Sequence, residues 1–169
     1  AAGGGIVRTV TATRAASVDD LVAAARPRLA DALAQGTTTC EVKSGYGLTT
    51  KAELRSLRAI GAAASRHPMS VVRTFLGAHE VPVEYRGRRT EYVRLIVDDM
   101  IPAVAGAGLA EWCDVFCETG VFTPAESQAI LEAGARHGLK PRIHADALGL
   151  SGGAADAATV GARSAHHLI

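Results

Sequence analysis

The chain has 169 residues, of which 48% are hydrophobic and 21% charged, a composition typical of one globular domain. A formal net charge of +1, an aromatic content of only 4% and the lack of a basic tract give no support for nucleic-acid binding. No apolar run approaches the roughly 20 residues that span a bilayer, and residues 1–10 lack the pattern of a signal peptide. We therefore expect a cytoplasmic protein without nucleic-acid or membrane partners.

Helical and strand patterns alternate along the chain, as judged from the spacing of apolar residues and from helix-capping signals. Thr50 and Glu53 fit a capping box at the start of the second helix, and Pro27 should bend or interrupt the first helix. Strands that alternate with helices indicate an α/β fold with a parallel sheet. The predicted elements, in chain order, are a helix over residues 18–36, a strand over 37–42, a helix over 51–67, a strand over 70–79, a helix over 89–102, a strand over 111–118, a helix over 124–137, a strand over 140–146, a helix over 152–161 and a strand over 162–169.

Two architectures accommodate these βα units. One is a complete doubly wound sheet of the flavodoxin type. The other is an arc of a TIM barrel, with about five of the eight strands of that fold, whose usual length is about 250 residues. The segment SGYGLTT at residues 44–50 has two glycines but not the spacing of a phosphate-binding loop, so nucleotide binding has weak support. We expect parallel βα units that form part of a TIM barrel.

The cysteines suggest a reducing compartment. Cys40, Cys113 and Cys117 are an odd number without the spacing of a zinc site, which favours reduced thiols in a cytosol. Because Cys113 and Cys117 lie on one side of the same predicted strand, we expect both side chains in the core.

Polar side chains gather where the predicted strands end. Four of the six histidines lie there, whereas His67 and His137 lie at helix C-termini, where the helix dipole favours a cation. In a TIM barrel the carboxyl ends of the strands surround one mouth, which carries the active site. Imidazoles and carboxylates that meet at this mouth can hold a divalent metal and transfer protons. The strand-end residues are Lys43, Ser44, Tyr46, His79, Glu80, Glu118, His144, Asp146, His166 and His167.

These segments resemble imidazolonepropionase, a family of the amidohydrolase superfamily. The resemblance is carried by EVKSGYGL, TFLGAHEVP, DVFCETGVF, HAD and SAHHL, and it extends almost from Gly3 to Leu168. It implies a metal-dependent TIM barrel with a small β domain made by the two ends of the chain. It also implies hydrolysis of the cyclic amide of 4-imidazolone-5-propanoate to N-formimidoyl-L-glutamate, a step of histidine degradation, by water activated on Zn²⁺ or Fe²⁺.

The resemblance assigns roles to four residues. His144 matches the metal-binding histidine of the family, and Tyr46 and His79 match residues that contact the substrate. His167 matches the catalytic histidine that stabilises or protonates the substrate near the reacting carbonyl. Lys43 and Glu41 have a second interpretation, as a buried ion pair that lines the barrel.

Two positions depart from the family pattern. Ala147 lies three residues after His144, where the family has an acidic or amide side chain that contacts the substrate and handles a proton. His166 replaces the aspartate that precedes the catalytic histidine, whereas Asp146 is retained one position before Ala147. These departures leave two alternatives open. One is another cyclic-amide hydrolase or aminohydrolase of the superfamily, and the other is a truncated, non-catalytic homologue that acts as a binding module.

Other family elements have no counterpart in the chain. These are a His-x-His pair, an arginine for the substrate carboxylate and the last metal-binding aspartate. We therefore expect residues 1–169 to be a partial TIM-barrel catalytic domain, the central part of a longer enzyme, and to be inactive without its flanking strands and small β domain. The whole enzyme is expected to act on a small molecule as a homodimer.

Overall fold

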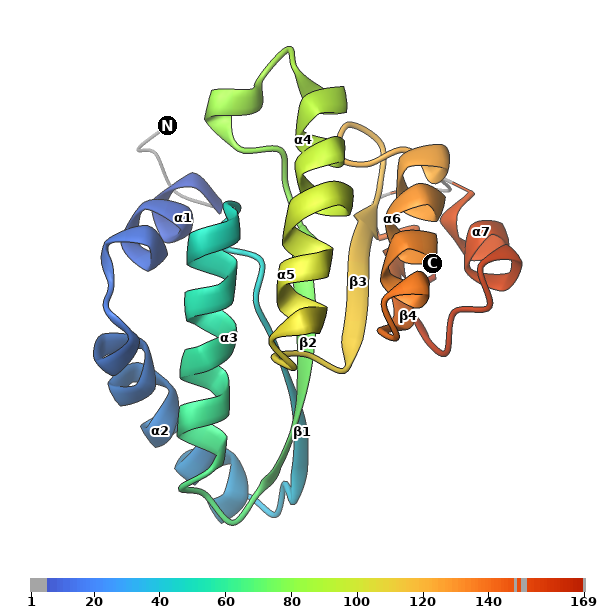
Figure 1. Cartoon of the computed structure of the whole chain (residues 1–169). Coiled ribbons are helices and arrows are strands. Elements are labelled where there is room, and N and C mark those ends of the chain that lie inside the picture. Colours follow the sequence, from blue (N-terminus) through green and yellow to red (C-terminus); the bar gives the residue numbers. More distant parts are fainter. Residues whose placement is uncertain (1–5, 148, 150–151, 169) are drawn as a thin grey trace.

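The strands form one parallel sheet in chain order. The computed structural model describes residues 6–147, 149 and 152–168, and in it every strand lies beside its neighbours in the sequence (Figure 1). A doubly wound sheet would instead place its strands out of chain order. The prediction of an arc of a TIM barrel is therefore confirmed over this part of the chain. The strands are β1 (Thr39–Lys43), β2 (Ser70–Ala78), β3 (Trp112–Cys117), β4 (Lys140–Ala145) and β5 (Ala165–His167).

Helices connect the strands and cover the outer face of the sheet (Figure 1). Among these contacts, α3 packs on β2, α6 on β3 and β4, and α7 on β4. Within the part of the chain that the structure describes, no helix has the length and apolar character needed to cross a membrane. The helices are α1 (Ile6–Ala15), α2 (Val18–Ala34), α3 (Thr50–Ala64), the 3-10 turn η1 (Val83–Tyr85), α4 (Arg89–Leu95), the π-helical turn η2 (Ile96–Met100), α5 (Ile101–Gly106), α6 (Pro124–Arg136) and α7 (Gly153–Thr159).

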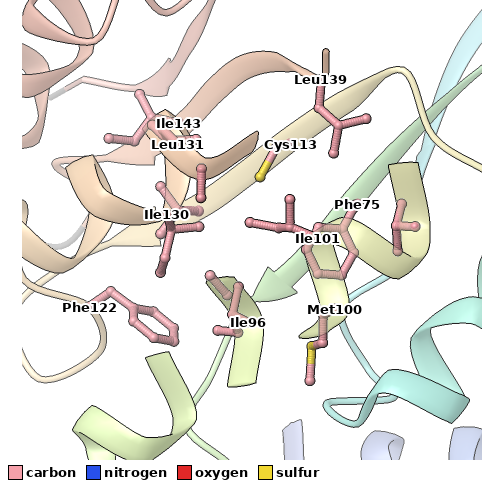
Figure 2. Packing of buried hydrophobic residues seen from close by; sticks show 14 of the residues in the cluster. Phe75, Ile96, Met100, Ile101, Cys113, Phe122, Ile130, Leu131, Leu139 and Ile143 are labelled. Atoms are coloured by element: carbon pink, nitrogen blue, oxygen red, sulfur yellow. The ribbon is translucent and has the colours of Figure 1, made fainter. Parts of the chain in front are cut away.

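The main core fills the space between the sheet and these helices. Figure 2 shows Phe75, Ile101 and Cys113 together between the strands and the helices, and all three are fully buried. Cys117 is fully buried as well, so the expectation of two core cysteines is confirmed. Close packing here needs a glycine, since a Cβ atom on Gly134 of α6 would lie 2.7 Å from the Cβ of Cys113. Each large apolar side chain buried in this way contributes about 1.5–3 kcal/mol.

The predicted helix over residues 89–102 is longer and less regular than expected. It continues to Gly106 and contains the π-helical turn η2 just before Pro102. Proline has no N–H to donate into the helix, and a wider turn on its N-terminal side accommodates that loss. The turn places Ile96 and Met100 in the core, where both are fully buried.

The first two helices differ from what the sequence indicated. Helix α1 has a sequence rich in β-branched residues, which are poor helix formers, and it was not predicted. It is held by tertiary contacts, because Val10 is buried and the Nε of Arg14 donates to the carbonyl of Gly47 at 2.6 Å. Pro27 was expected to bend or interrupt α2, and the helix is not interrupted there.

Strand β1 presents an open edge. Ser44 N donates to Thr74 O and Ser70 N donates to Thr38 O, so even-numbered residues of β1 bond to β2 and odd-numbered residues face away. Unpaired N–H and C=O groups of this kind favour pairing with another chain. We predict that the 169-residue chain by itself dimerises or aggregates, as measured by light scattering after size-exclusion chromatography.

The substitution Thr39→Pro tests whether β1 is the contact. Thr39 is the exposed first residue of the strand, so proline removes an outward N–H while the bonds to β2 remain. We expect this variant to associate less than the wild type, whereas Thr39→Val, which keeps the N–H, should associate like it. A monodisperse monomer of the wild-type chain would contradict the prediction.

Candidate active site at the carboxyl ends of the strands

The structure brings the four predicted site residues to one rim of the sheet, where they form two pairs. The rings of Tyr46, after β1, and His79, after β2, meet edge to face with their centroids 4.8 Å apart. The rings of His144 at the end of β4 and His167 at the end of β5 lie 5.4 Å apart. Phe116 of β3 lies between the pairs, 6.3 Å from His79 and 6.5 Å from His144. One row of rings therefore crosses the mouth.

The backbone at the end of β5 positions two histidines against His144. His166 is paired with His144 in the sheet register, and their rings stack 4.7 Å apart with an angle of 9° between planes. His167 has a φ of +76°, a left-handed conformation that is uncommon outside glycine, and alternation along a strand alone would not place its ring on the same side. Burial and the charges of His144, Lys43 and Arg142 lower the pKa of His166.

Asp114 of β3 connects His144 to the charges inside the curled sheet. Its side chain is fully buried. The carboxylate accepts from the Nζ of Lys43 at 2.7 Å and from the Nδ1 of His144 at 3.0 Å. Burial alone would raise the pKa of Asp114, but the hydrogen bond and charge of His144, together with Lys43, hold it below its ordinary value. Sequence reasoning missed this residue, although an aspartate in the middle of the apolar strand WCDVFC was a signal that could have found it.

Glu41 and Lys43 of β1 form the ion pair that their second interpretation predicted. The Nζ of Lys43 lies 2.8 Å from the carboxylate of Glu41, and each side chain is about one fifth exposed. Arg142 of β4 pairs with the same carboxylate, and Thr74 of β2 donates to it. Burial opposes ionisation of Glu41, but Lys43, Thr74 and Arg142 together lower its pKa. Charged side chains of β1, β3 and β4 are thus joined below the rim.

The loop after β1 is held by a buried carboxylate. Glu53 was expected to cap α3 together with Thr50, but the N-cap is Thr49, whose side chain accepts from Ala52 N. The fully buried carboxylate of Glu53 instead accepts from the backbone N–H groups of Gly45, Gly47 and Leu48 at 2.8–3.0 Å. The capping-box prediction was wrong because the fold brings three loop N–H groups within reach of this side chain.

The other strand-end carboxylates bind backbone. Asp146 has a φ of +53° and accepts from Ala154 N at the start of α7, at 3.3 Å. Glu118 accepts from Ala147 N at 2.9 Å, and Glu80 accepts from the N–H of the residue that follows it. Contacts of this type shape the loops around the mouth.

Within the described ranges, no group of three or more histidine, cysteine, aspartate or glutamate side chains is arranged to hold a metal ion. The surroundings of His144 are typical of a metal ligand. Its Nδ1 is fixed by the Asp114 carboxylate at 3.0 Å, which leaves Nε2 for coordination.

The fold resembles that of a known enzyme. A crystal structure of an adenine deaminase from Arthrobacter aurescens superposes with a TM-score of 0.66, at 14% sequence identity, over 93% of this chain and 47% of the deaminase chain. At that level of identity the similarity concerns the fold alone. The chain thus has the architecture of part of a TIM barrel.

Sequence comparison is more specific. The chain is 55% identical to an imidazolonepropionase from Shouchella clausii, 57% identical to one from Symbiobacterium thermophilum and 52% identical to one from Haloarcula marismortui. These alignments cover 99–100% of this chain and 38–40% of the relatives, so the chain spans about two fifths of their length. No family model matches the chain. The resemblance to imidazolonepropionase that the motifs indicated is confirmed along nearly the whole chain.

The paired charge of Glu41 predicts a pH-dependent effect on stability. Because its folded-state pKa is lowered from the ordinary 4.5, its contribution is complete above that pH and is lost as the pH falls through the folded-state pKa. We predict that Glu41→Gln lowers the free energy of unfolding by about 1–3 kcal/mol at pH 7. The difference from the wild type should shrink as the pH is lowered below 4.5.

Denaturant unfolding at several pH values measures this effect. Glu91→Gln is a suitable control, because Glu91 pairs with Arg88 at 2.9 Å on the surface with 53% of its side chain exposed. Exposed pairs contribute about 0–1 kcal/mol. An equal loss for both variants at pH 7, or a loss for Glu41→Gln that does not change with pH, would count against the paired interior charge.

Proposed function

We propose that the protein containing this chain hydrolyses the cyclic amide of 4-imidazolone-5-propanoate to N-formimidoyl-L-glutamate, in histidine degradation. The observation that carries the proposal is the placement of Tyr46 with His79, and of His144 with His167, on one rim. The 52–57% identity to imidazolonepropionases supports the choice of substrate. In this proposal residues 1–169 form a partial TIM-barrel catalytic domain of a cytoplasmic homodimer, and the rest of the protein supplies the flanking strands and the small β domain.

Tyr46 and His79 are proposed to bind the planar ring of the substrate. Tyr46 is 36% exposed at the rim, and its phenol can donate a hydrogen bond to a carbonyl oxygen. The Nδ1 of His79 lies 3.0 Å from the carbonyl oxygen of Gly45, so in the neutral ring Nδ1 carries the hydrogen and donates it. The Nε2 of His79 is then an acceptor for an N–H group of the imidazolone ring.

His144 is proposed to bind a divalent metal, Zn²⁺ or Fe²⁺, through Nε2. The Asp114 carboxylate on Nδ1 supports this role, because a second hydrogen-bonded nitrogen orients a metal-binding imidazole and raises its basicity. Such an ion lowers the pKa of a bound water to about 7 and polarises a carbonyl group. The remaining ligands would come from outside the described residues.

His167 is proposed to act on the proton. Hydrolysis adds water to the ring carbonyl carbon and breaks its bond to nitrogen, which must leave with a proton. An imidazole 5.4 Å from His144, ring to ring, is close enough to stabilise the carbonyl oxygen or to protonate the leaving nitrogen. His166, whose ring stacks on that of His144, is the second imidazole available for that transfer.

An assay of the whole protein with 4-imidazolone-5-propanoate tests the proposal. We predict hydrolysis, measured by the loss of imidazolone absorbance, that a chelator abolishes and added metal restores. His144→Gln should lower kcat by at least about 10³-fold, because general acid–base residues alone contribute about 10²- to 10⁴-fold and this change removes a metal ligand. His137→Gln, at the end of α6 and away from the rim, is the matched control.

Three results would separate the alternatives. Hydrolysis of a different cyclic amide, or deamination of an aromatic amine, in place of this reaction would assign another activity of the superfamily. Binding of the substrate without turnover would favour a non-catalytic binding module. Activity that survives His144→Gln would remove the metal role of that residue.

The two departures from the family pattern generate a further prediction. If an acidic side chain after His144 normally relays a proton, Ala147→Glu should raise kcat by about 10²-fold or more. If His166 has taken over that transfer, His166→Asp alone should lower kcat, and Ala147→Glu should help only in the double variant. Values of kcat for the wild type, both single variants and the double variant distinguish these cases. Equal kcat values in all four proteins would show that neither position handles the proton.

A further inference from the structure

The loop of residues 44–48 is fixed from both sides of its backbone. The buried carboxylate of Glu53 accepts from three of its N–H groups, those of Gly45 at 3.0 Å and of Gly47 and Leu48 at 2.8 Å. On the opposite side, the guanidinium of Arg14 donates to the carbonyls of Gly47 at 2.6 Å and Leu48 at 3.4 Å. Five backbone polar groups of this loop therefore have a charged partner.

The conformation of this loop depends on its two glycines. A Cβ atom on Gly47 would lie 2.7–2.8 Å from Ala52 and from the nitrogen of Glu53, so the loop and α3 are too close for any side chain at this position. Gly45 has a φ of +115°, a conformation that favours glycine. This close approach allows the side chain of Glu53, in the first turn of α3, to reach three N–H groups of the loop.

A carboxylate suits this place better than any neutral side chain. All three of its partners are N–H donors, and a glutamine would present a donor of its own to at least one of them. Glu53 lies in the first turn of α3, where the helix dipole favours a negative charge. Several N–H donors and a helix N-terminus together offset the cost of burying the charge.

The held loop carries Tyr46 and contacts His79, the two residues at one end of the row of rings. Tyr46 lies between the anchored amides of Gly45 and Gly47, and the carbonyl of Gly45 accepts from the Nδ1 of His79. The position of Gly45 therefore fixes which nitrogen of His79 carries the hydrogen. Tyr46 in turn contacts the edge of His79, with ring centroids 4.8 Å apart.

We propose that Glu53 is a positioning residue of the substrate site, which holds Tyr46 in place and selects the Nδ1–H tautomer of His79 through the backbone of the loop. Glu53 does not touch the substrate. This inference rests on the proposed function insofar as Tyr46 and His79 bind the substrate, but its effect on the loop and on His79 is independent of what the substrate is.

The test compares Glu53→Gln with Glu126→Gln in the whole protein. Glu126 is a matched control, because its carboxylate also accepts from a backbone N–H at a helix start, that of Thr123 at 2.8 Å, but on α6 and away from the loop. The readouts are kcat and KM for 4-imidazolone-5-propanoate, and the ¹⁵N shifts of the His79 ring, assigned with His79→Gln. Thermal unfolding is measured for both variants.

We expect Glu53→Gln to lower kcat/KM by about 10- to 100-fold, the cost of misplacing binding groups by about 1 Å, with most of the loss in KM. We also expect the hydrogen of the His79 ring to move in part from Nδ1 to Nε2. Glu126→Gln should lower the melting temperature but leave kcat/KM within about twofold of the wild type and the His79 signals unchanged, since surface-cap losses act on stability. If Glu53→Gln lowers only the melting temperature, the positioning role is wrong.

A measurement on the wild-type protein covers the case in which Glu53→Gln does not fold. Residue-resolved amide exchange should show the N–H groups of Gly45, Gly47 and Leu48 protected by at least about 10²-fold relative to a free loop. Fast exchange at these three amides would overturn the proposal. If the wild type does not hydrolyse the imidazolone, the proposed function fails, while amide exchange and the His79 shifts still decide the role of Glu53.

Discussion

The pairing of charges inside the curled sheet is the constraint on which the rest of the site depends. The Asp114 carboxylate is fully buried, and a buried ion without partners would cost several kcal/mol. Lys43 from β1 and His144 from β4 satisfy it from two sides. Both bonds depend on the observed strand order and register. The bond to Lys43 joins side chains of β1 and β3, which are not adjacent, across the concave face, and the bond to His144 joins the neighbouring strands β3 and β4. The same register brings the strand ends to one rim.

Above this layer of charge, the site is made by the way in which each strand stops. Leu48, Asp146 and His167 all have positive φ values without being glycine, and all three follow or end a strand at the rim. Residues in this conformation persist when the surroundings determine them, and they tend to cluster at functional sites. Here a buried glutamate holds the first of these turns, an aspartate bound to α7 the second, and sheet pairing of β5 the third. Conformations that are locally unfavourable thus aim the rings of Tyr46, His79 and His167 into one row.

The cluster of histidines at β4 and β5 differs in chemistry from the acidic arrangement that the resemblance to the family implies. Where an acidic or amide side chain is expected after His144 there is Ala147, and its backbone N–H binds Glu118. Where an aspartate is expected before His167 there is His166, whose ring stacks on His144. Relative to the pattern that the resemblance implies, an imidazole with a lowered pKa takes the place of negative charge near His144. A neutral imidazole can still accept or pass on a proton, which an alanine cannot do.

The sequence by itself determined the alternation of strands and helices, the parallel sheet, and the polar groups at the strand ends, because these follow from local periodicity and from helix-capping signals. Motif resemblance added Tyr46, His79, His144 and His167. Tertiary structure alone decided the rest. It made a helix of the β-branched segment Ile6–Ala15 through contacts of Val10 and Arg14, and it turned Glu53 from an expected helix cap into the anchor of a loop. It also placed Asp114 between Lys43 and His144. In each case the deciding partner lies at least five residues away or on another strand, so no local pattern could have revealed it. The nearest such contact, from Leu48 N to the Glu53 carboxylate, depends on how the loop folds back on α3.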